Sequence, residues 1–141
     1  MLTYLNQTYN KDVIQGMAGY GTIYADIVVF DLTYKFKPTH AFRIELQNLS
    51  TKQDYGDWAM GLLEYTIAPK WFFTIMDQYN YGNDHKNKRV HYMNGAIGFT
   101  KNSNRFQLGY GKQREGIVCV GGVCRNVPAS NGFTLTITSS F

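Results

Sequence analysis

Hydrophobic and polar residues alternate along most of this chain, in segments of about ten residues. In the segment AFRIELQNLS, Phe42, Ile44 and Leu46 fall on one face of an extended strand. Arg43 and Glu45, which lie between them, fall on the other face. Helical periodicity is almost absent, so the pattern predicts an all-β protein.

The alternation predicts eight antiparallel strands. They cover 2–9, 22–36, 41–50, 58–67, 70–81, 89–100, 104–113 and 132–141. The three prolines, Pro38, Pro69 and Pro128, all fall between these segments. That placement supports the assignment, because proline cannot serve a central strand. At 141 residues, we expect a single domain that spans 1–141.

The connections between the predicted strands alternate in length. The short ones are 37–40, 68–69 and 101–104, and the long ones are 11–21, 51–57, 82–88 and 114–131. Short turns at one end and long loops at the other are typical of a transmembrane β-barrel. Strands of about ten residues also match the length that crosses a bilayer at a tilt. The fold class predicted is therefore an antiparallel, up-and-down transmembrane β-barrel of about eight strands.

Aromatic residues make up 16% of the chain, and they gather at the two ends of the predicted strands. Near the short turns and the last residue lie Phe36, Phe42, Tyr65, Trp71, Phe99, Phe106 and Phe141. Toward the long loops lie Tyr24, Trp58, Tyr79, Tyr81, Tyr92 and Tyr110. Two such clusters, with smaller aliphatic residues between them, indicate the two aromatic girdles of a membrane barrel.

Charged residues interrupt the polar face in the middle of several strands. This predicted lumen set contains Asp31, Lys35, Arg43, Glu45, Glu64 and Arg105. In a barrel, these groups would pair with one another and hold the strand register, or set charge selectivity if water passes between them. Because the interior of an eight-stranded barrel is largely filled by side chains, we expect the structural role and poor conduction.

A soluble β-barrel of the lipocalin type, or a β-sandwich, shows the same alternation. In that alternative the apolar face points inward and would bind a small hydrophobic ligand or form a core. Periodicity alone does not distinguish inside from outside. The charged polar face, the aromatic strand ends and the alternating loop lengths together favour the membrane protein.

Composition and motifs exclude several other classes. The formal net charge of +4 is too mild and too scattered to indicate nucleic acid as a partner. No Ser/His/Asp set stands out, so we expect neither an enzyme nor a cofactor. His85 and His91, with Asp84, fit no familiar metal-site spacing and predict a solvated loop. Three cations of that loop, Lys86, Lys88 and Arg89, are candidates for contact with anionic lipopolysaccharide.

Two further features concern membrane-spanning helices and signal peptides. The longest apolar runs are short, as at 27–30, whereas a membrane-spanning helix needs roughly 20 residues. The first ten residues, MLTYLNQTYN, have neither the basic start nor the apolar stretch of a signal peptide.

Cys119 and Cys124 lie close together in the longest predicted loop, with Gly121 and Gly122 between them. The loop is small and flexible enough for a disulfide, which we favour over free thiols and over a metal site. A disulfide would place the loop outside the cytosol. A further alternative function is surface adhesion or docking through the loop 114–131.

Asp77 does not fit the alternation of its own strand. If Trp71, Phe73 and Ile75 face lipid, strict alternation places Asp77 on the lipid side too. It then lies near the upper interface, where exposure of a carboxylate costs little. A β-bulge would instead turn it inward.

Three segments resemble the C-terminal part of a Gram-negative outer-membrane family of β-barrel proteins, described as porin-like and of unknown function. They are THAFRIELQ, LLEYTIAPKWFFTIMDQYNYG and GYGKQREGIVCVGGVCRNVPASNGFTLTITSSF. The resemblance runs from about YNKDVIQG to the last residue, and it is most specific at the ending. It implies the outer membrane as location, with no catalytic residues.

The resemblance also implies a terminal signal for the β-barrel assembly machinery. That signal consists of Leu135, Ile137 and an aromatic last residue, Phe141, whereas Ser139 departs from the apolar pattern. Members of the family are several times longer than this chain and begin with a signal peptide. We therefore expect a C-terminal fragment, a truncated reading frame or a trimmed version. Its eight strands would close alone or form the C-terminal portion of a larger barrel.

Overall fold

The structure is a computed structural model. It describes residues 1–10, 12–13, 18–19, 21–53, 55–114, 116–120 and 123–139, and only the backbone in 116–120 and 123–127. Eight strands form one sheet. They are β1 (Leu2–Asn10), β2 (Thr22–Lys37), β3 (His40–Ser50), β4 (Trp58–Ile67), β5 (Trp71–Tyr79), β6 (His91–Lys101), β7 (Asn104–Gln113) and β10 (Ser130–Ser139).

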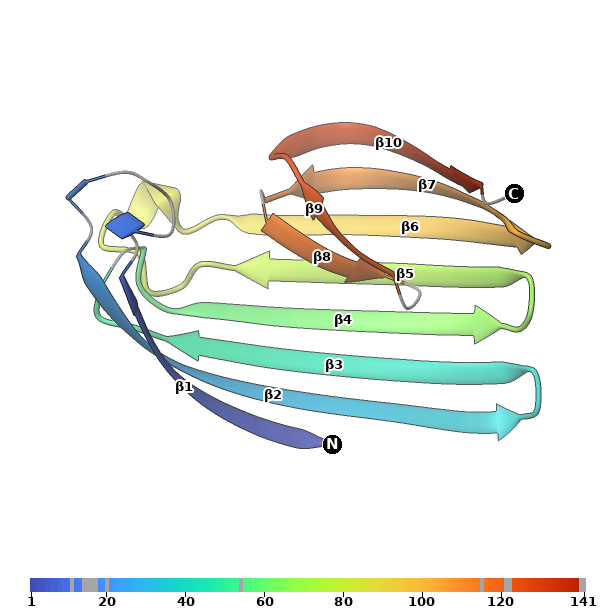
Figure 1. The fold of residues 1–141 in the computed structure, drawn as a ribbon, viewed down its shortest axis with the longest axis horizontal. Coiled ribbons are helices and arrows are strands. Elements are labelled where there is room, and N and C mark those ends of the chain that lie inside the picture. The colour runs from blue at the N-terminus through green and yellow to red at the C-terminus, as the bar shows by residue number, and fades with distance from the viewer. Residues whose placement is uncertain are drawn as a thin grey trace.

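The sheet is an antiparallel meander in which each strand pairs with the next along the chain, in the order β1-β2-β3-β4-β5-β6-β7-β10 (Figure 1). Its two edge strands, β1 and β10, are not paired with each other in the described structure. The prediction of eight antiparallel strands is thus confirmed, whereas the sheet itself is open. Within the described residues, the one 3-10 helix is η1 (Lys86–Lys88), in the connection between β5 and β6.

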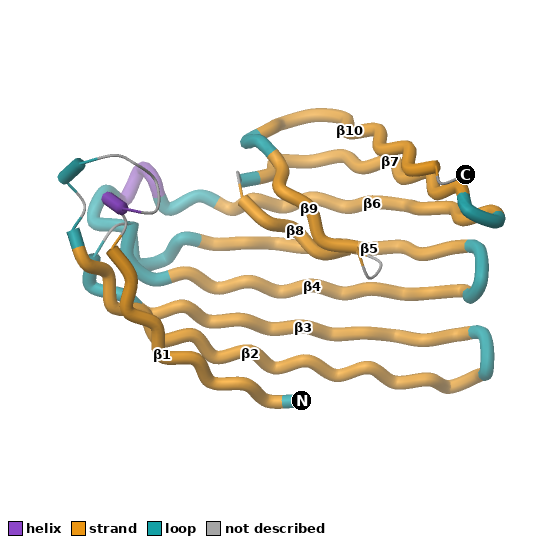
Figure 2. Tube along the Cα trace, in the orientation of Figure 1, coloured by secondary structure: helices purple, strands orange, loops and turns teal. Residues whose placement is uncertain are grey.

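Short turns and long connections lie at opposite ends of the strands, as Figure 2 shows for the teal segments. The turns β2–β3, β4–β5 and β6–β7 lie at one end, which we call the short-turn end. The connections β1–β2, β3–β4 and β5–β6 and the segment between β7 and β10 leave from the long-loop end. In the β6–β7 turn Asn102 has φ 55°, a conformation that asparagine tolerates better than most residues.

The segment between β7 and β10 contains two strands that the sequence analysis placed in a loop. They are β8 (Gly116–Val120) and β9 (Val123–Val127), which pair as a separate two-stranded sheet. The predicted connection 114–131 therefore contains a hairpin that the prediction of eight strands did not include. Two valine-rich runs on either side of Gly121 and Gly122 are a hairpin pattern that the sequence does contain.

The pleat separates the side chains of the sheet onto two faces. The apolar face carries, among others, Phe30 and Leu32 of β2, Ile44 and Leu46 of β3, Leu63 of β4, Phe73 and Ile75 of β5, Ile97 of β6, Leu108 of β7, and Phe133, Leu135 and Ile137 of β10. The polar face carries Asp31, Arg43, Glu45, Glu64, Thr74 and Gln107 together with Leu62, Phe72 and Met76.

Burial is inverted relative to a water-soluble protein. The buried side chains Ile23 and Leu62, which expose 1% and 2% of their surface, lie on the polar face, as do the buried Phe72 and Met76. Large side chains of the apolar face are exposed, and Phe133 reaches 79%. Soluble proteins place their apolar face in the core, whereas the apolar face of this sheet is left uncovered by the described residues.

Candidate functional site

A charged cluster lies on the polar face across strands β2, β3 and β4. Asp31 and Glu45 are direct register partners, and two like charges in that position repel each other. Arg43 lies between them. Its Nε donates a hydrogen bond to Asp31 Oδ2 at 2.7 Å, and its guanidinium also pairs with the Glu45 carboxylate. One cation therefore compensates two carboxylates from neighbouring strands.

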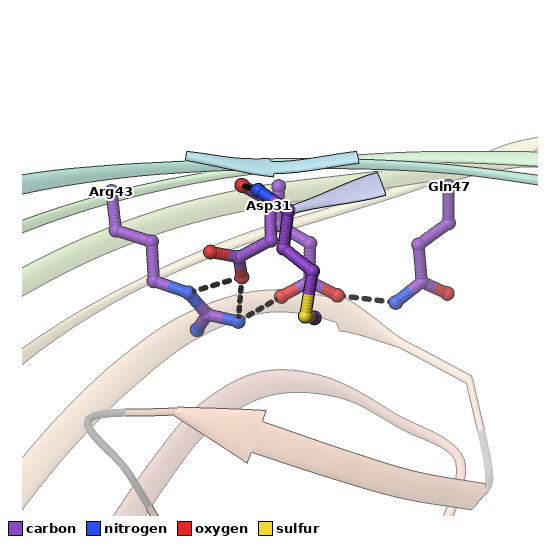
Figure 3. A network of polar contacts seen from close by, with 5 residues as sticks. Asp31, Arg43 and Gln47 are labelled. Carbon is purple, nitrogen blue, oxygen red and sulfur yellow. Dashed lines mark hydrogen bonds and ion pairs between the residues drawn. The ribbon is translucent and has the colours of Figure 1, made fainter. Parts of the chain in front are cut away.

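Two further residues extend the charged cluster. The side-chain amide of Gln47 donates a hydrogen bond to the carboxylate of Glu45 (Figure 3). Glu64 is the register partner of Arg43 on β4, and only 8% of its surface is exposed. The structure thus brings together four of the six predicted lumen residues, because strand register places them side by side.

The other two predicted lumen residues lie on β7 and near the end of β2. Arg105, on β7, has its guanidinium carbon 4.2 Å from the centre of the Phe72 ring, a cation–π contact. Phe72 itself lies across Gly98, its register partner on β6. Lys35, near the end of β2, is exposed and does not join the charged cluster.

Asp77 lies on the apolar face, because the pairing of β5 with both neighbours runs through it without a bulge. Its Oδ2 lies 2.6 Å from Nδ1 of His91, and the imidazole stacks on Tyr79 with ring centres 4.1 Å apart. Both partners are near the long-loop end of their strands. The continuous register therefore fixes the orientation of Asp77. Its partner is His91, a pairing that the sequence pattern did not predict.

Aromatic rings form a continuous series near the short-turn end of the apolar face. Phe36 stacks with Tyr65, Tyr65 with Phe73, and Phe73 with Trp71. The series ends at Phe99, whose ring centre is 4.7 Å from that of Trp71. It runs from β2 to β6 and contains four of the seven residues predicted for the cluster at this end, together with Phe73.

The aromatic cluster predicted at the long-loop end divides between the two faces. Tyr79 and Tyr110 lie on the apolar face, where Tyr110 contacts Phe133 at a centroid distance of 4.7 Å. Trp58 and Tyr92 lie on the polar face and contact each other at 6.0 Å. Trp58 and Tyr92 thus do not share a face with Tyr79 and Tyr110, so the residues predicted for one girdle lie on both faces of the sheet.

The last strand places the predicted assembly residues Leu135 and Ile137 on the apolar face, with 66% and 60% of their surface exposed. Phe141 lies outside the described residues. Cys119 and Cys124 face each other as register partners of β8 and β9. Their side chains are outside the described part of the structure, so the disulfide stays a prediction.

The chemistry of the described residues is that of ion pairs, amide hydrogen bonds and ring contacts. No group of three or more metal-ligating side chains occurs among the residues that the structure describes. Within the same part of the chain, no helix has the length and hydropathy to cross a membrane.

Comparison with known proteins gives one result. The whole chain, residues 1–141, matches a protein family described as a family of unknown function (DUF6029). No curated protein and no solved structure matches the chain significantly. A match over the full length shows membership, and the chain therefore belongs to the DUF6029 family of unknown function.

Proposed function

We propose that this chain is the wall of a β-barrel in the outer membrane, with a structural or porin-like role and no enzymatic activity. The observation that carries the proposal is the exposed apolar face. Large apolar side chains follow one another on it from β2 to β10, and they include Leu32, Ile75 and Leu135. Soluble monomers rarely expose contiguous apolar patches beyond a few hundred Å². Lipid chains are the surroundings in which such a face is stable.

The aromatic series at the short-turn end also supports a barrel whose apolar face points toward lipid. Tyr65 and Trp71 combine an apolar ring with a polar group, and this suits them to the depth where lipid chains meet head groups. Tyr65 also contacts Nδ1 of His40 through its hydroxyl group at 2.7 Å. A polar contact at one end of the strands, beside apolar residues further along them, fits an interfacial belt.

The polar face would line the inside of the barrel. Its ion pairs between Arg43, Asp31 and Glu45 join neighbouring strands, and this supports a role in holding register. Large side chains such as Phe72 and Met76 share this face. In a barrel of eight strands they would fill the interior, so we expect poor conduction of ions.

The edges β1 and β10 restrict how the sheet can sit in a bilayer. Open strand edges are not tolerated in the hydrocarbon region, because their backbone groups would have no hydrogen-bond partners. The two edges must therefore pair with each other, in a closed eight-stranded barrel, or with further strands, in a larger one. β1 and β10 run in opposite directions, as antiparallel closure requires (Figure 1).

Three partners follow for such a barrel. Outer-membrane lipid would contact the apolar face, and lipopolysaccharide would meet Lys86, Lys88 and Arg89 at the long-loop end. The β-barrel assembly machinery would recognise the last strand through Leu135, Ile137 and Phe141. The proposal is supported here by the exposure of Leu135 and Ile137 on β10.

The test is fractionation of cells that produce the chain, followed by gel electrophoresis with and without heating. We expect recovery from the outer-membrane fraction only with detergent, and a band that migrates differently after boiling. A change of Phe141→Asp should reduce recovery in the membrane, whereas Lys35→Gln should not. Recovery of a folded, monomeric protein in detergent-free buffer would contradict the proposal.

A further inference from the structure

We infer that the long-loop end of the polar face holds a binding site for a small anionic solute, formed by Trp58, Tyr92, Lys112 and Arg114. The inference deepens the proposed function, on which it rests, by naming the class of solute that the barrel would bind at its mouth. We call these four residues the mouth cluster. It lies away from the charged cluster of Arg43.

The mouth cluster joins two cations to two neighbouring rings. Trp58 begins β4 and Tyr92 lies at the start of β6, with ring centres 6.0 Å apart and planes inclined by 36°. The guanidinium carbon of Arg114 lies 4.2 Å from the centre of the Trp58 ring. Nζ of Lys112 lies 4.9 Å from the centre of the Tyr92 ring. The rings therefore hold both cations in one place.

Among the described residues, no carboxylate pairs with either of these two cations, Lys112 and Arg114. Arg43, by contrast, pairs with two carboxylates. A cation–π contact positions a cation but leaves its charge available, so the mouth cluster presents two positive charges to an incoming anion.

A second, independent observation concerns two amides beside the cluster. Asn80 exposes only 3% of its surface, and its Oδ1 has no hydrogen-bond partner among the described residues. Asn94 has a buried Nδ2 that, in the same part of the chain, also lacks a partner. Asn94 follows Tyr92 by two residues on the same face of β6, and Asn80 follows Gln78, the register partner of Tyr92, by two residues.

Buried polar atoms without a partner are rare and costly, and those found in native proteins often mark a site that a ligand completes. The two amides offer one acceptor and one donor to a solute, while Lys112 and Arg114 offer charge. This set fits a small hydroxylated molecule with a carboxylate or phosphate group. An apolar molecule would leave both amides and both charges unpaired.

The test is a fluorescence titration of the folded, full-length protein with glucuronate and, in parallel, with uncharged glucose. The variant Trp71→Phe leaves Trp58 as the single tryptophan, so the emission reports on the mouth cluster. We expect saturable quenching by glucuronate and none by glucose. The double variant Lys112→Gln and Arg114→Gln should weaken binding several-fold, whereas Lys70→Gln and Lys101→Gln, at the short-turn end, should leave it unchanged.

Folding of each sample is checked by the shift of the gel band on heating, so that loss of binding and loss of the barrel are separated. A heat-modifiable protein that glucuronate does not quench would overturn the inference and leave the proposed function standing. Equal quenching by glucose, or unchanged binding in the double variant, would overturn it as well. The variant Asn94→Ala, which removes no charge, provides a second probe and should weaken glucuronate binding.

Discussion

The ring of Phe72 lies across the backbone of Gly98, its register partner on β6. A Cβ atom at Gly98 would come within 1.9 Å of two carbons of that ring. The ring has little freedom to move, because Phe72 is buried and Arg105 covers it at 4.2 Å. Glycine is therefore required at this position by a side chain rather than by the backbone conformation.

From this contact we expect Gly98→Ala to lower the free energy of unfolding by about 1–3 kcal/mol, the usual cost of overpacking a filled interior. The measurement is urea-induced unfolding in detergent, followed by tryptophan fluorescence. Gly95→Ala is the matched control on the same strand, since its Cβ would meet only Thr74 O at 3.4 Å. Equal stability of the two variants would contradict a filled polar face.

Arg43→Met should also destabilise the protein, because it leaves Asp31 and Glu45 as opposed like charges on neighbouring strands. Leaving partly buried partners of a charged hydrogen bond unpaired costs about 1–3 kcal/mol. The same unfolding measurement applies, with Lys35→Met as the control outside the charged cluster. Adding Glu45→Gln to Arg43→Met should restore part of the loss. Identical behaviour of Arg43→Met and Lys35→Met would show that the ion pairs do not hold the sheet.

Strand pairing explains why part of this site was predictable. The alternation in AFRIELQNLS placed Arg43 and Glu45 on one face, and the structure confirms it. The partnership of Arg43 with Asp31, however, depends on the register across the β2–β3 turn, which alternation does not define. The faces of Trp58 and Tyr92 follow from parity with Glu64 and Asn94, whereas their position at strand ends does not define a face.

On the apolar face, Leu63→Arg tests depth in the bilayer. Leu63 lies in the middle of β4, where a lipid-facing arginine costs about 2–4 kcal/mol. Asn48→Arg, near the long-loop end of β3 on the same face, should cost about 0–1 kcal/mol. Unfolding in lipid vesicles measures both. If Leu63→Arg cost no more stability than Asn48→Arg, the apolar face would be in contact with water.

Cys119 and Cys124 should form a disulfide. They are opposed in an antiparallel pair, where Cα atoms lie about 4.5–5.5 Å apart, and disulfides span about 4.4–6.8 Å. We expect a maleimide reagent to label neither cysteine in exported protein before reduction and both after it, as counted by mass spectrometry. Labelling of both thiols without reduction would exclude the bond.

In a membrane barrel, the apolar face of this sheet contacts lipid and the polar face does not. The chain has two tryptophans, and they lie on opposite faces, Trp71 on the apolar and Trp58 on the polar face. The variants Trp58→Phe and Trp71→Phe each leave one of them as the reporter.

The most direct test reconstitutes both variants in vesicles that contain lipids with brominated chains, which quench tryptophan on contact. We expect strong quenching of Trp71 in Trp58→Phe and little quenching of Trp58 in Trp71→Phe. Equal quenching of the two, or quenching of Trp58 alone, would contradict a barrel whose apolar face alone contacts lipid.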